Sequence, residues 1–263
     1  MTPPAATKRS DRWFRVFAAY CAWYLPRHFH RLLVAEAPVL PPDRPVIVYS
    51  NHPGWWDPLI YILLADRLFA GRPSYGPMDA AGLAQYPFLD RVGIFGIDTN
   101  SRAGAVQFLR TADQVLSNPA AMLWITAEGA FTDPRQRPLT LRSGIAHLAR
   151  RHPGAILLPL AIEYPFWLQS KPEALMRFGA PLVASPDWSV VEWGQELTAA
   201  LTTTLDHLAA QSIAREDAGF QPLLAGRAGV GGLYDMWRAG RAALSGRSFD
   251  PRHRLSTKQE PQP

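Results

Sequence analysis

A histidine and an aspartate five residues apart are the side chains of this sequence best placed to do chemistry. His52 and Asp57 lie in the run NHPGWWDP, which directly follows the apolar run VIVYS. A neighbouring carboxylate fixes the tautomer of an imidazole and stabilises the imidazolium that forms when the ring takes a proton. His52 could therefore act as general base toward a substrate hydroxyl, an effect of about 10²–10⁴-fold on rate. The same spacing also fits an ordinary turn in which Asn51 and Asp57 act as caps.

A second polar segment, TAEGAFTDPR (residues 126–135), follows the apolar run MLWIT. Glu128 and Gly129 place a carboxylate and a flexible backbone just after that run. Backbone amides around Gly129 could hold an oxyanion or the phosphate of a cofactor arm. The alternative is an ordinary tight turn.

The elements that must position these segments alternate between strand-like and helix-like patterns. Such alternation predicts an α/β fold with a mostly parallel sheet, in which chemistry lies at the carboxyl ends of the strands. Pro159 suggests that its strand is an edge or carries a bulge. The expected strands are 46–50, 122–126, 156–162 and 176–182, and the expected helices are 58–69, 143–151, 191–211 and one capped by Ser101 with an apolar stripe of Val106, Leu109, Ala112 and Leu116.

The length and composition suit one large α/β domain or one domain with appendages. The chain has 263 residues, of which 48% are hydrophobic, enough to bury a sizeable core. The single cysteine, Cys21, excludes an intramolecular disulfide and a cysteine metal cluster, and favours a reducing compartment. Because Cys21 lies in an apolar aromatic run, we interpret it as a packing residue rather than a nucleophile.

The distribution of charge favours a membrane surface over nucleic acid as the partner. The net charge is +5, but residues 1–35 carry +5, residues 224–263 carry +4 and the segment between them carries −4. Aromatic residues and arginines gather in residues 13–34, which we interpret as one or two helices interrupted by Pro26. Such a segment suits the headgroup region of a bilayer, although it could simply cover the core. No run reaches the roughly 18 to 20 apolar residues of a spanning helix.

Several segments, in order along the chain, resemble the motifs of the glycerolipid acyltransferase family, which includes the lysophospholipid acyltransferases. NHPGWWDP resembles its first motif, which is Asn-His, four residues and Asp. GIFGIDTNSR (93–102), AEGAF (127–131) and LPLAI (158–162) resemble the second, third and fourth motifs. LRSGIAHLA (141–149) resembles the helix after the third motif, and RFGAPL resembles the strand after the fourth. The resemblance spans about 38–182.

This resemblance implies an O-acyltransferase of phospholipid biosynthesis. It implies a mixed, largely parallel sheet flanked by helices, a glycerol-3-phosphate acyltransferase-like fold with an N-terminal membrane-docking helical element. His52 would be the general base, Asp57 its partner, and Glu128 and Gly129 would line the acceptor or donor site. The donor would be acyl-CoA or acyl-carrier protein, with no bound cofactor, no metal and no acyl-enzyme intermediate. The protein would sit peripherally on membrane lipids at the cytoplasmic face of the cell membrane.

The departures from the family pattern concern recognition of the acceptor. Thr99 and Phe131 stand where the family commonly has arginines, and Ala80 and Gly82 where it often has lysine and glutamate. A phosphate prefers a bidentate arginine or a helix terminus, and Phe131 offers neither. Arg102, Arg135 or Arg137 could substitute from nearby, so we include Arg102, Phe131 and Arg135 among the substrate-binding candidates. The expected acceptor is therefore a lipid alcohol other than lysophosphatidic acid.

The chain divides by these criteria into a disordered leader (1–10), N-terminal interfacial helices (11–35), an acyltransferase domain (36–223) and a basic C-terminal helix and tail (224–263). Two other functions stay open. A thioesterase or lipid hydrolase could use the same His-Asp pair on water, and a catalytically inactive homologue could bind lipid alone.

Overall fold

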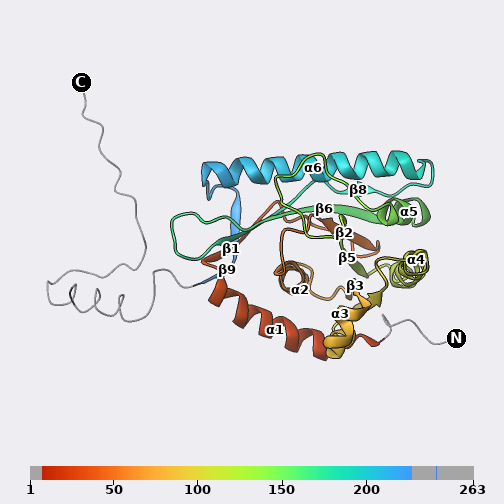
Figure 1. Cartoon of the computed structure of the whole chain (residues 1–263), viewed down its shortest axis with the longest axis horizontal. Coiled ribbons are helices and arrows are strands. Elements are labelled where there is room, and N and C mark those ends of the chain that lie inside the picture. Colours follow the sequence, from red (N-terminus) through yellow and green to blue (C-terminus); the bar gives the residue numbers. More distant parts are fainter. Residues whose placement is uncertain (1–7, 227–240, 242–263) are drawn as a thin grey trace, which may run out of the picture.

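A single mixed sheet with helices on both faces forms the body of the protein, in a computed structural model that describes residues 8–226 and 241 (Figure 1). The helices are α1 (Asp11–His28), α2 (Asp57–Leu68), α3 (Ala80–Gln85), the 3₁₀ helix η2 (Pro87–Arg91), α4 (Arg102–Leu116), α5 (Gly144–Arg151) and α6 (Val190–Ala214). The strands are β1 (Arg31–Ala35), β2 (Val46–Ser50), β3 (Ser74–Asp79), β4 (Ile94–Ile97), β5 (Met122–Thr126), β6 (Ile156–Glu163), β7 (Glu173–Phe178), β8 (Leu182–Val183) and β9 (Phe220–Ala225).

The strand order confirms the mixed, largely parallel sheet. It runs β4-β3-β5-β2-β6-β7-β1-β9, with β8 paired to β6. From β4 to β6 every neighbouring pair is parallel, whereas β7 and β8 run antiparallel to β6, and β9 runs antiparallel to β1. The carboxyl ends of β5, β2 and β6 therefore lie side by side in the middle of the sheet, and the polar segments that follow them meet there.

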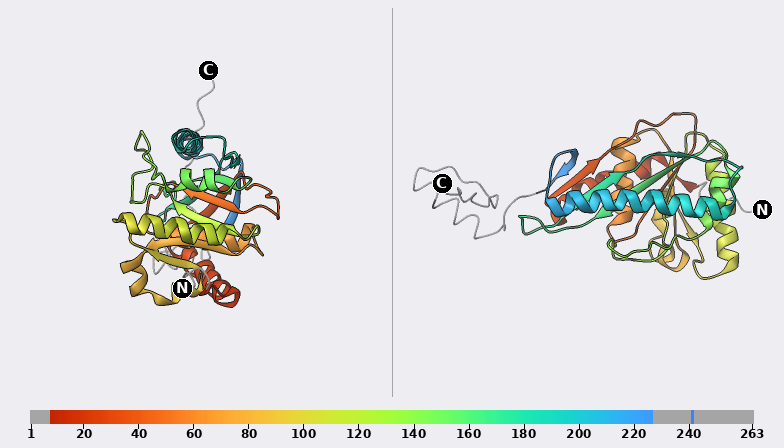
Figure 2. Two further views of the ribbon diagram at one scale, coloured as in Figure 1. Left: turned by 90° about the vertical axis from the view of Figure 1, so that its right-hand side faces the viewer. Right: turned by 90° about the horizontal axis from the view of Figure 1, so that it is seen from above.

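Helices cover the sheet in two layers. One apolar core lies between the sheet and α1 and α2, and the other between the sheet and α4, α5 and α6. Figure 1 shows α6 above the sheet with α2 and α1 below, and Figure 2 shows α6 running along the sheet. All five residues of β2 are buried because both its faces are covered, which explains the unbroken apolar run VIVYS.

Helix α1 packs one stripe of small and apolar side chains inward. Phe14, Ala18, Cys21 and Leu25 are buried in the core that α1 shares with α2. Burial raises the pKa of the Cys21 thiol to about 12, so the thiol stays protonated and unreactive. Cys21 is thus a packing residue, as the sequence indicates.

The helical interpretation of residues 13–34 is wrong at its end. The helix stops at His28, two residues after Pro26, and Arg31–Ala35 forms β1. This strand lies between β7 and β9, and β9 is a strand that the sequence patterns did not reveal. Pairing partners on both sides make an extended backbone the favourable state for the apolar run RLLVA. Residues 31–35 therefore belong to the main sheet. The expected start of the C-terminal helix at residue 224 is also wrong, because residues 224 and 225 end β9, and the rest of that segment lies outside the described residues except for residues 226 and 241.

Three smaller expectations also need correction. β6 is a central strand, and Pro159 is tolerated because its missing N–H lies between the residues that pair with β8 and those that pair with β7. The expected strand 176–182 is two strands, β7 and β8. Ser101 does cap α4, through a hydrogen bond from the Gly104 amide, but the buried face contains Phe108, Ala112, Val115 and Leu116 while Val106 is exposed.

Asn51 extends the pairing of β2 and β6 by one side chain. Its Nδ2 donates to the Ile162 carbonyl and its Oδ1 accepts from the Ile162 amide, both at 2.9 Å. The residue is 1% exposed, so no water replaces these bonds. The amide side chain thus satisfies two backbone groups of β6 and fixes the point where the chain leaves the sheet toward His52.

We expect Asn51→Ala to lower the free energy of unfolding by about 2 to 4 kcal/mol, because it leaves two buried backbone groups without partners. Urea denaturation measures the change. Asn100→Ala, which removes an exposed amide, is the matched control and should change stability by less than about 0.5 kcal/mol. Equal effects of the two substitutions would contradict this account of Asn51.

Candidate active site

His52 and Asp57 form a direct pair. The Nδ1 atom of His52 lies 2.5 Å from Oδ2 of Asp57. An ionised carboxylate only accepts hydrogen bonds, so Nδ1 carries the proton and Nε2 keeps a free lone pair. The imidazole is 16% exposed and lines a cavity, which makes Nε2 the nitrogen that a substrate can reach. The pair therefore has the geometry of an oriented general base.

Asp57 is fully buried and held by three donors. Besides His52, the Gly54 amide donates to Oδ2 at 3.2 Å, and the Tyr164 hydroxyl donates to Oδ1. Asp57 is also the first residue of α2, where the helix dipole favours a negative charge. These contacts replace the water that the carboxylate loses on burial, and they hold it in one orientation.

Two buried phenols surround this carboxylate. Burial, and then the negative charge of Asp57, raise the pKa of Tyr164 and the pKa of Tyr61 well above the ordinary value. The Tyr61 hydroxyl is hydrogen-bonded to Oγ of Ser50, at the end of β2. Both phenols therefore stay protonated at neutral pH, and Tyr164 remains a donor to Asp57 throughout that range.

A large, mostly apolar cavity of about 1040 Å³ opens at His52. Its walls come from α1, α2, β3, β4, α4 and β5, and from the segment after β5. Trp55 is exposed and lines this cavity, whereas Trp56 turns inward and packs edge-on against Phe29. The cavity lies at the upper end of the usual range of ligand pockets, about 300 to 1,000 Å³. It offers a long apolar ligand a place beside the imidazole.

The segment after β5 folds back over His52. The Thr132 amide donates to the His52 carbonyl at 3.1 Å, and the Thr132 hydroxyl donates to Glu128. The ring of Phe131 lies 4.3 Å from that of His52, centroid to centroid, although Phe131 is 64% exposed. The two polar segments predicted from the sequence therefore meet at one site.

The structure brings some predicted site residues together and leaves others apart. Gly129 and Phe131 line the cavity with His52. Glu128 does not line it, because its carboxylate turns to Thr132. Arg102 is exposed on the first turn of α4 and also stays outside the cavity wall. Arg135 is bound to Asp133 at 2.7 Å and is not part of that wall, and Arg137, the third candidate substitute, pairs with Asp206.

Sequence reasoning missed two residues of this site. Tyr164 lies just beyond the expected strand 156–162, and its link to Asp57 spans 107 residues, so no local pattern reveals it. Arg142 lies in the run LRSGIAHLA, where a single arginine before a helix gives no signal of its own. Tyr164 reaches the site through the pairing of β2 with β6, and Arg142 through hydrogen bonds to the Ala127 and Thr99 carbonyls.

The family model described as Acyltransferase matches residues 31–163, slightly more than half of the chain. The chain belongs to the acyltransferase family. His52, Asp57, Gly129 and Arg142 all lie inside the matched region, and the protein is an acyltransferase. Tyr164 follows its last residue.

A solved structure shares the fold of this acyltransferase. The crystal structure of the 1-acyl-sn-glycerophosphate (LPA) acyltransferase PlsC from Thermotoga maritima superposes with a TM-score of 0.55. The two chains are 14% identical, and the match covers 75% of this chain and 80% of PlsC. No curated protein matches the sequence at a significant level.

We expect Tyr164→Phe to lower kcat about 10-fold with little change in KM, because Asp57 loses one of its three donors and orients the imidazole less firmly. Steady-state kinetics measure both parameters.

The matched control is Tyr49→Phe, which removes a buried phenol whose hydroxyl donates to the Leu197 carbonyl on the other face of the sheet. It should leave kcat and KM unchanged. An unchanged kcat in Tyr164→Phe, or the same fall in both variants, would mean that Tyr164 only packs.

Proposed function

We propose that this acyltransferase moves a fatty acyl group from an acyl thioester to a hydroxyl of a lipid acceptor. The observation that carries the proposal is the His52–Asp57 pair, which opens onto an apolar cavity large enough for a lipid chain. The donor is acyl-CoA or acyl-carrier protein, and the acceptor is a lysophospholipid-like or other lipid alcohol. Family membership supports the class of reaction.

In the proposed mechanism, Nε2 of His52 takes the proton of the acceptor hydroxyl as its oxygen attacks the thioester carbonyl. Asp57 stabilises the imidazolium through Nδ1. The tetrahedral intermediate collapses with cleavage of the carbon–sulfur bond, and the leaving thiolate recovers the proton from His52. The products are an ester and a free thiol, and no acyl-enzyme intermediate forms.

The turn after β5 is the proposed oxyanion site. Gly129 has a positive φ of 69°, a conformation that glycine adopts readily, and it lines the cavity. In the described part of the chain the amides of Ala130 and Phe131 donate to no protein acceptor, and both residues line the cavity. Two free amide donors beside the general base suit the oxygen of a tetrahedral intermediate.

The proposed acceptor is a lipid alcohol other than lysophosphatidic acid. Phe131 presents an apolar ring against His52, and Thr99 gives the cavity wall a neutral side chain. A lysophospholipid with another headgroup, an aminolipid or a glycosylated isoprenoid alcohol fits these residues. A high kcat/KM with lysophosphatidic acid would contradict this part of the proposal.

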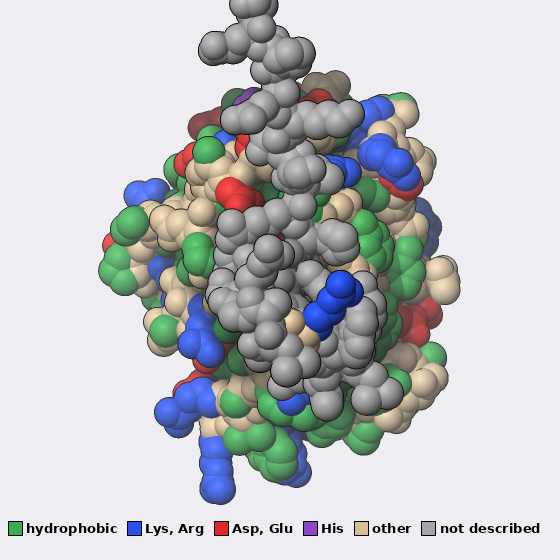
Figure 3. Space-filling model, turned by 90° about the vertical axis from the view of Figure 1, so that its left-hand side faces the viewer, with side chains coloured by type: hydrophobic (Ala, Val, Ile, Leu, Met, Phe, Trp, Pro, Cys, Tyr) green, Lys and Arg blue, Asp and Glu red, His purple; other side chains and the backbone are tan. Residues whose placement is uncertain are grey.

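The proposed location is the cytoplasmic face of a membrane, with α1 as the docking element. Its outer side exposes Trp13, Val16, Tyr20 and Trp23, opposite the stripe that packs on α2. Figure 3 shows hydrophobic and basic side chains together at the lower edge of the molecule, where α1 lies. Aromatic rings and arginines side by side suit the boundary between headgroups and acyl chains.

The position of the cavity supports the same orientation. Phe17 and Tyr20 of α1 are part of its wall, so a lipid at the surface of α1 has a short path to His52. Within residues 8–226 and 241, no helix is long and apolar enough to cross a bilayer.

We expect the double variant Trp13→Ser, Trp23→Ser to reduce binding to anionic phospholipid vesicles at least about 10-fold, because it removes apolar area from the outer stripe. Vesicle co-sedimentation measures the partition, which should also weaken with added salt. Trp188→Ser is the control for loss of an exposed tryptophan elsewhere and should bind like the wild type. Unchanged binding of the double variant would exclude α1 as the docking element.

The central test incubates the purified protein with labelled acyl-CoA, or acyl-carrier protein, and a total lipid extract. Mass spectrometry identifies the products. We expect an acylated lipid whose formation falls about 10²–10⁴-fold in His52→Ala, since that variant lacks the general base. His147→Ala, an exposed histidine on α5, is the matched control and should keep full activity.

The other outcomes separate the competing functions. Free fatty acid without any acylated lipid would identify a hydrolase. An absence of turnover with every donor would favour a lipid-binding protein. Lysophosphatidic acid supplied alone tests the acceptor, because the proposal expects it to be a poor substrate.

A further inference from the structure

Phe131 is an exposed aromatic side chain that rests on the general base. It is 64% exposed, yet its ring centroid lies 4.3 Å from that of His52, with the two planes tilted by 36°. At this distance and tilt the rings overlap by their faces rather than meet edge to edge. Phe131 therefore covers a face of the imidazole, while Nε2, at the edge of that ring, stays open to the cavity.

Two hydrogen bonds hold the segment that carries this ring. The Thr132 amide donates to the His52 carbonyl at 3.1 Å, and the Thr132 hydroxyl donates to the Glu128 carboxylate. The backbone next to Phe131 is thus tied to the residue that its ring covers. Glu128, which does not line the cavity, braces the same turn through Thr132.

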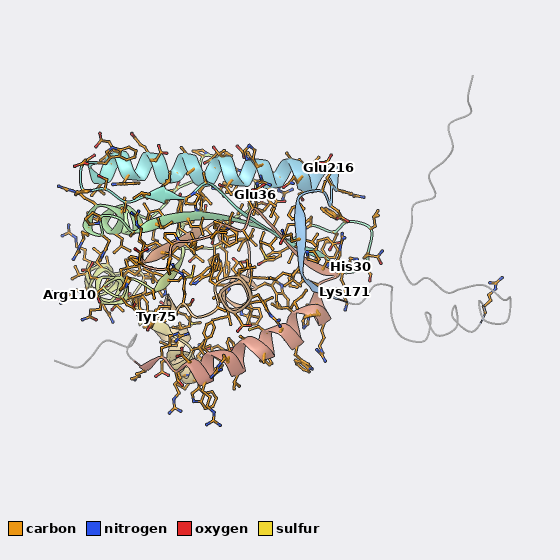
Figure 4. All side chains as sticks on the ribbon, turned by 180° about the vertical axis from the view of Figure 1, so that it is seen from behind. His30, Glu36, Tyr75, Arg110, Lys171 and Glu216 are labelled. Carbon is orange, nitrogen blue, oxygen red and sulfur yellow. The ribbon has the colours of Figure 1, made fainter. Side chains whose placement is uncertain are left out.

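Other aromatic rings of the cavity wall are engaged elsewhere. Among the described residues, Phe131 is the ring in contact with the imidazole of His52. Tyr75 of β3, which Figure 4 labels, also lines the cavity, but its ring lies 5.7 Å from the guanidinium carbon of Arg9. Trp55 packs edge-on against the residue that follows it. The cover on the imidazole therefore depends on one side chain.

Water is a competing nucleophile in this cavity. An imidazole that takes a proton from an alcohol also takes one from water. In that side reaction the water oxygen attacks the thioester carbonyl, His52 takes its proton, and the carbon–sulfur bond breaks as the leaving thiolate recovers the proton. The products are a fatty acid and a free thiol. A cavity of about 1040 Å³ holds many waters when no lipid fills it, so a transferase must keep water from the base.

We propose that Phe131 shields His52 from water and so sets the ratio of acyl transfer to thioester hydrolysis. The proposal rests on the acyltransferase function proposed above and names a residue that decides which nucleophile the enzyme accepts. An apolar ring beside the base offers water no hydrogen-bond partner, whereas the alkyl chain of a lipid alcohol gains apolar contact there. Discrimination against water thus resides in a side chain that transfers no proton.

The test measures two rates in the full-length protein, with acyl-CoA or acyl-carrier protein as the donor, whichever the wild type uses. Thiol release from the donor alone gives the hydrolysis rate, and acylated lipid formed with a total lipid extract gives the transfer rate. We expect Phe131→Ser to raise hydrolysis about 10-fold without raising transfer, because water then reaches the imidazole. Phe131→Tyr restores the ring and should return hydrolysis toward the wild-type rate.

The matched control is Phe166→Ser, because Phe166 is 65% exposed and lies outside the cavity wall. It should keep both wild-type rates. The hydrolysis gained in Phe131→Ser should disappear when His52→Ala is added, which shows that it uses the same base. Loss of folded protein lowers both rates together, so a rise in hydrolysis alone reports on the shield.

A second measurement needs no turnover. Diethylpyrocarbonate modifies an imidazole nitrogen that solvent reaches, and peptide mass spectrometry locates the product at His52 among the seven histidines of the chain. We expect Phe131→Ser to speed this modification at least about 3-fold, since the neutral ring is then more accessible. Phe166→Ser should react at the wild-type rate.

An unchanged hydrolysis rate in Phe131→Ser, or the same rise in Phe166→Ser, would overturn the proposal. A fall in transfer with no rise in hydrolysis would also overturn it, by assigning Phe131 to acceptor binding. If the wild type transfers no acyl group, the proposed function fails, while the modification rate of His52 still tests the shield.

Discussion

A buried carboxylate, that of Asp57, constrains the rest of the site. Removing a charge from water is costly, and the cost is offset only when donors surround it in fixed positions. Those donors are His52 and Gly54, in the turn after β2, and Tyr164, which follows β6. The turn, α2 and β6 must therefore keep their relative positions for these three donors to reach Asp57. The same contacts aim the imidazole at the cavity.

The central strands supply that rigidity. β2 lies between β5 and β6, and Asn51 continues the pairing with β6 by a side chain. Polar groups can gather at this edge because the backbones beneath them are fully paired and covered on both faces. The apolar cavity beside them lets a lipid chain approach without exposing the core to water, which strengthens the electrostatic contacts within.

Much of the sheet could be predicted because its strands are buried on both faces. Such strands read as unbroken apolar runs, as in Val46–Ser50 and Met122–Thr126, and their carboxyl ends locate the polar segments. The prediction failed at residues 31–35, where the chain is apolar enough for either a helix or a strand. Pairing with β7 and β9 decides between them, and those strands lie more than 130 residues away in sequence.

The local sequence specifies the His52–Asp57 pair, since five residues with a proline and a glycine bring the two side chains together in one turn. It also specifies the family, through motifs in order. Tyr164 and Arg142 reach the site only on folding, because their contacts are with residues distant in sequence, Asp57 for Tyr164 and Thr99 for Arg142. Glu128 and Arg135 turn away from the cavity through contacts that are close in sequence, with Thr132 and Asp133, and Arg102 is exposed on α4 outside the cavity wall. Only the tertiary structure decides these directions, because each side chain has several rotamers open to it until its surroundings are in place.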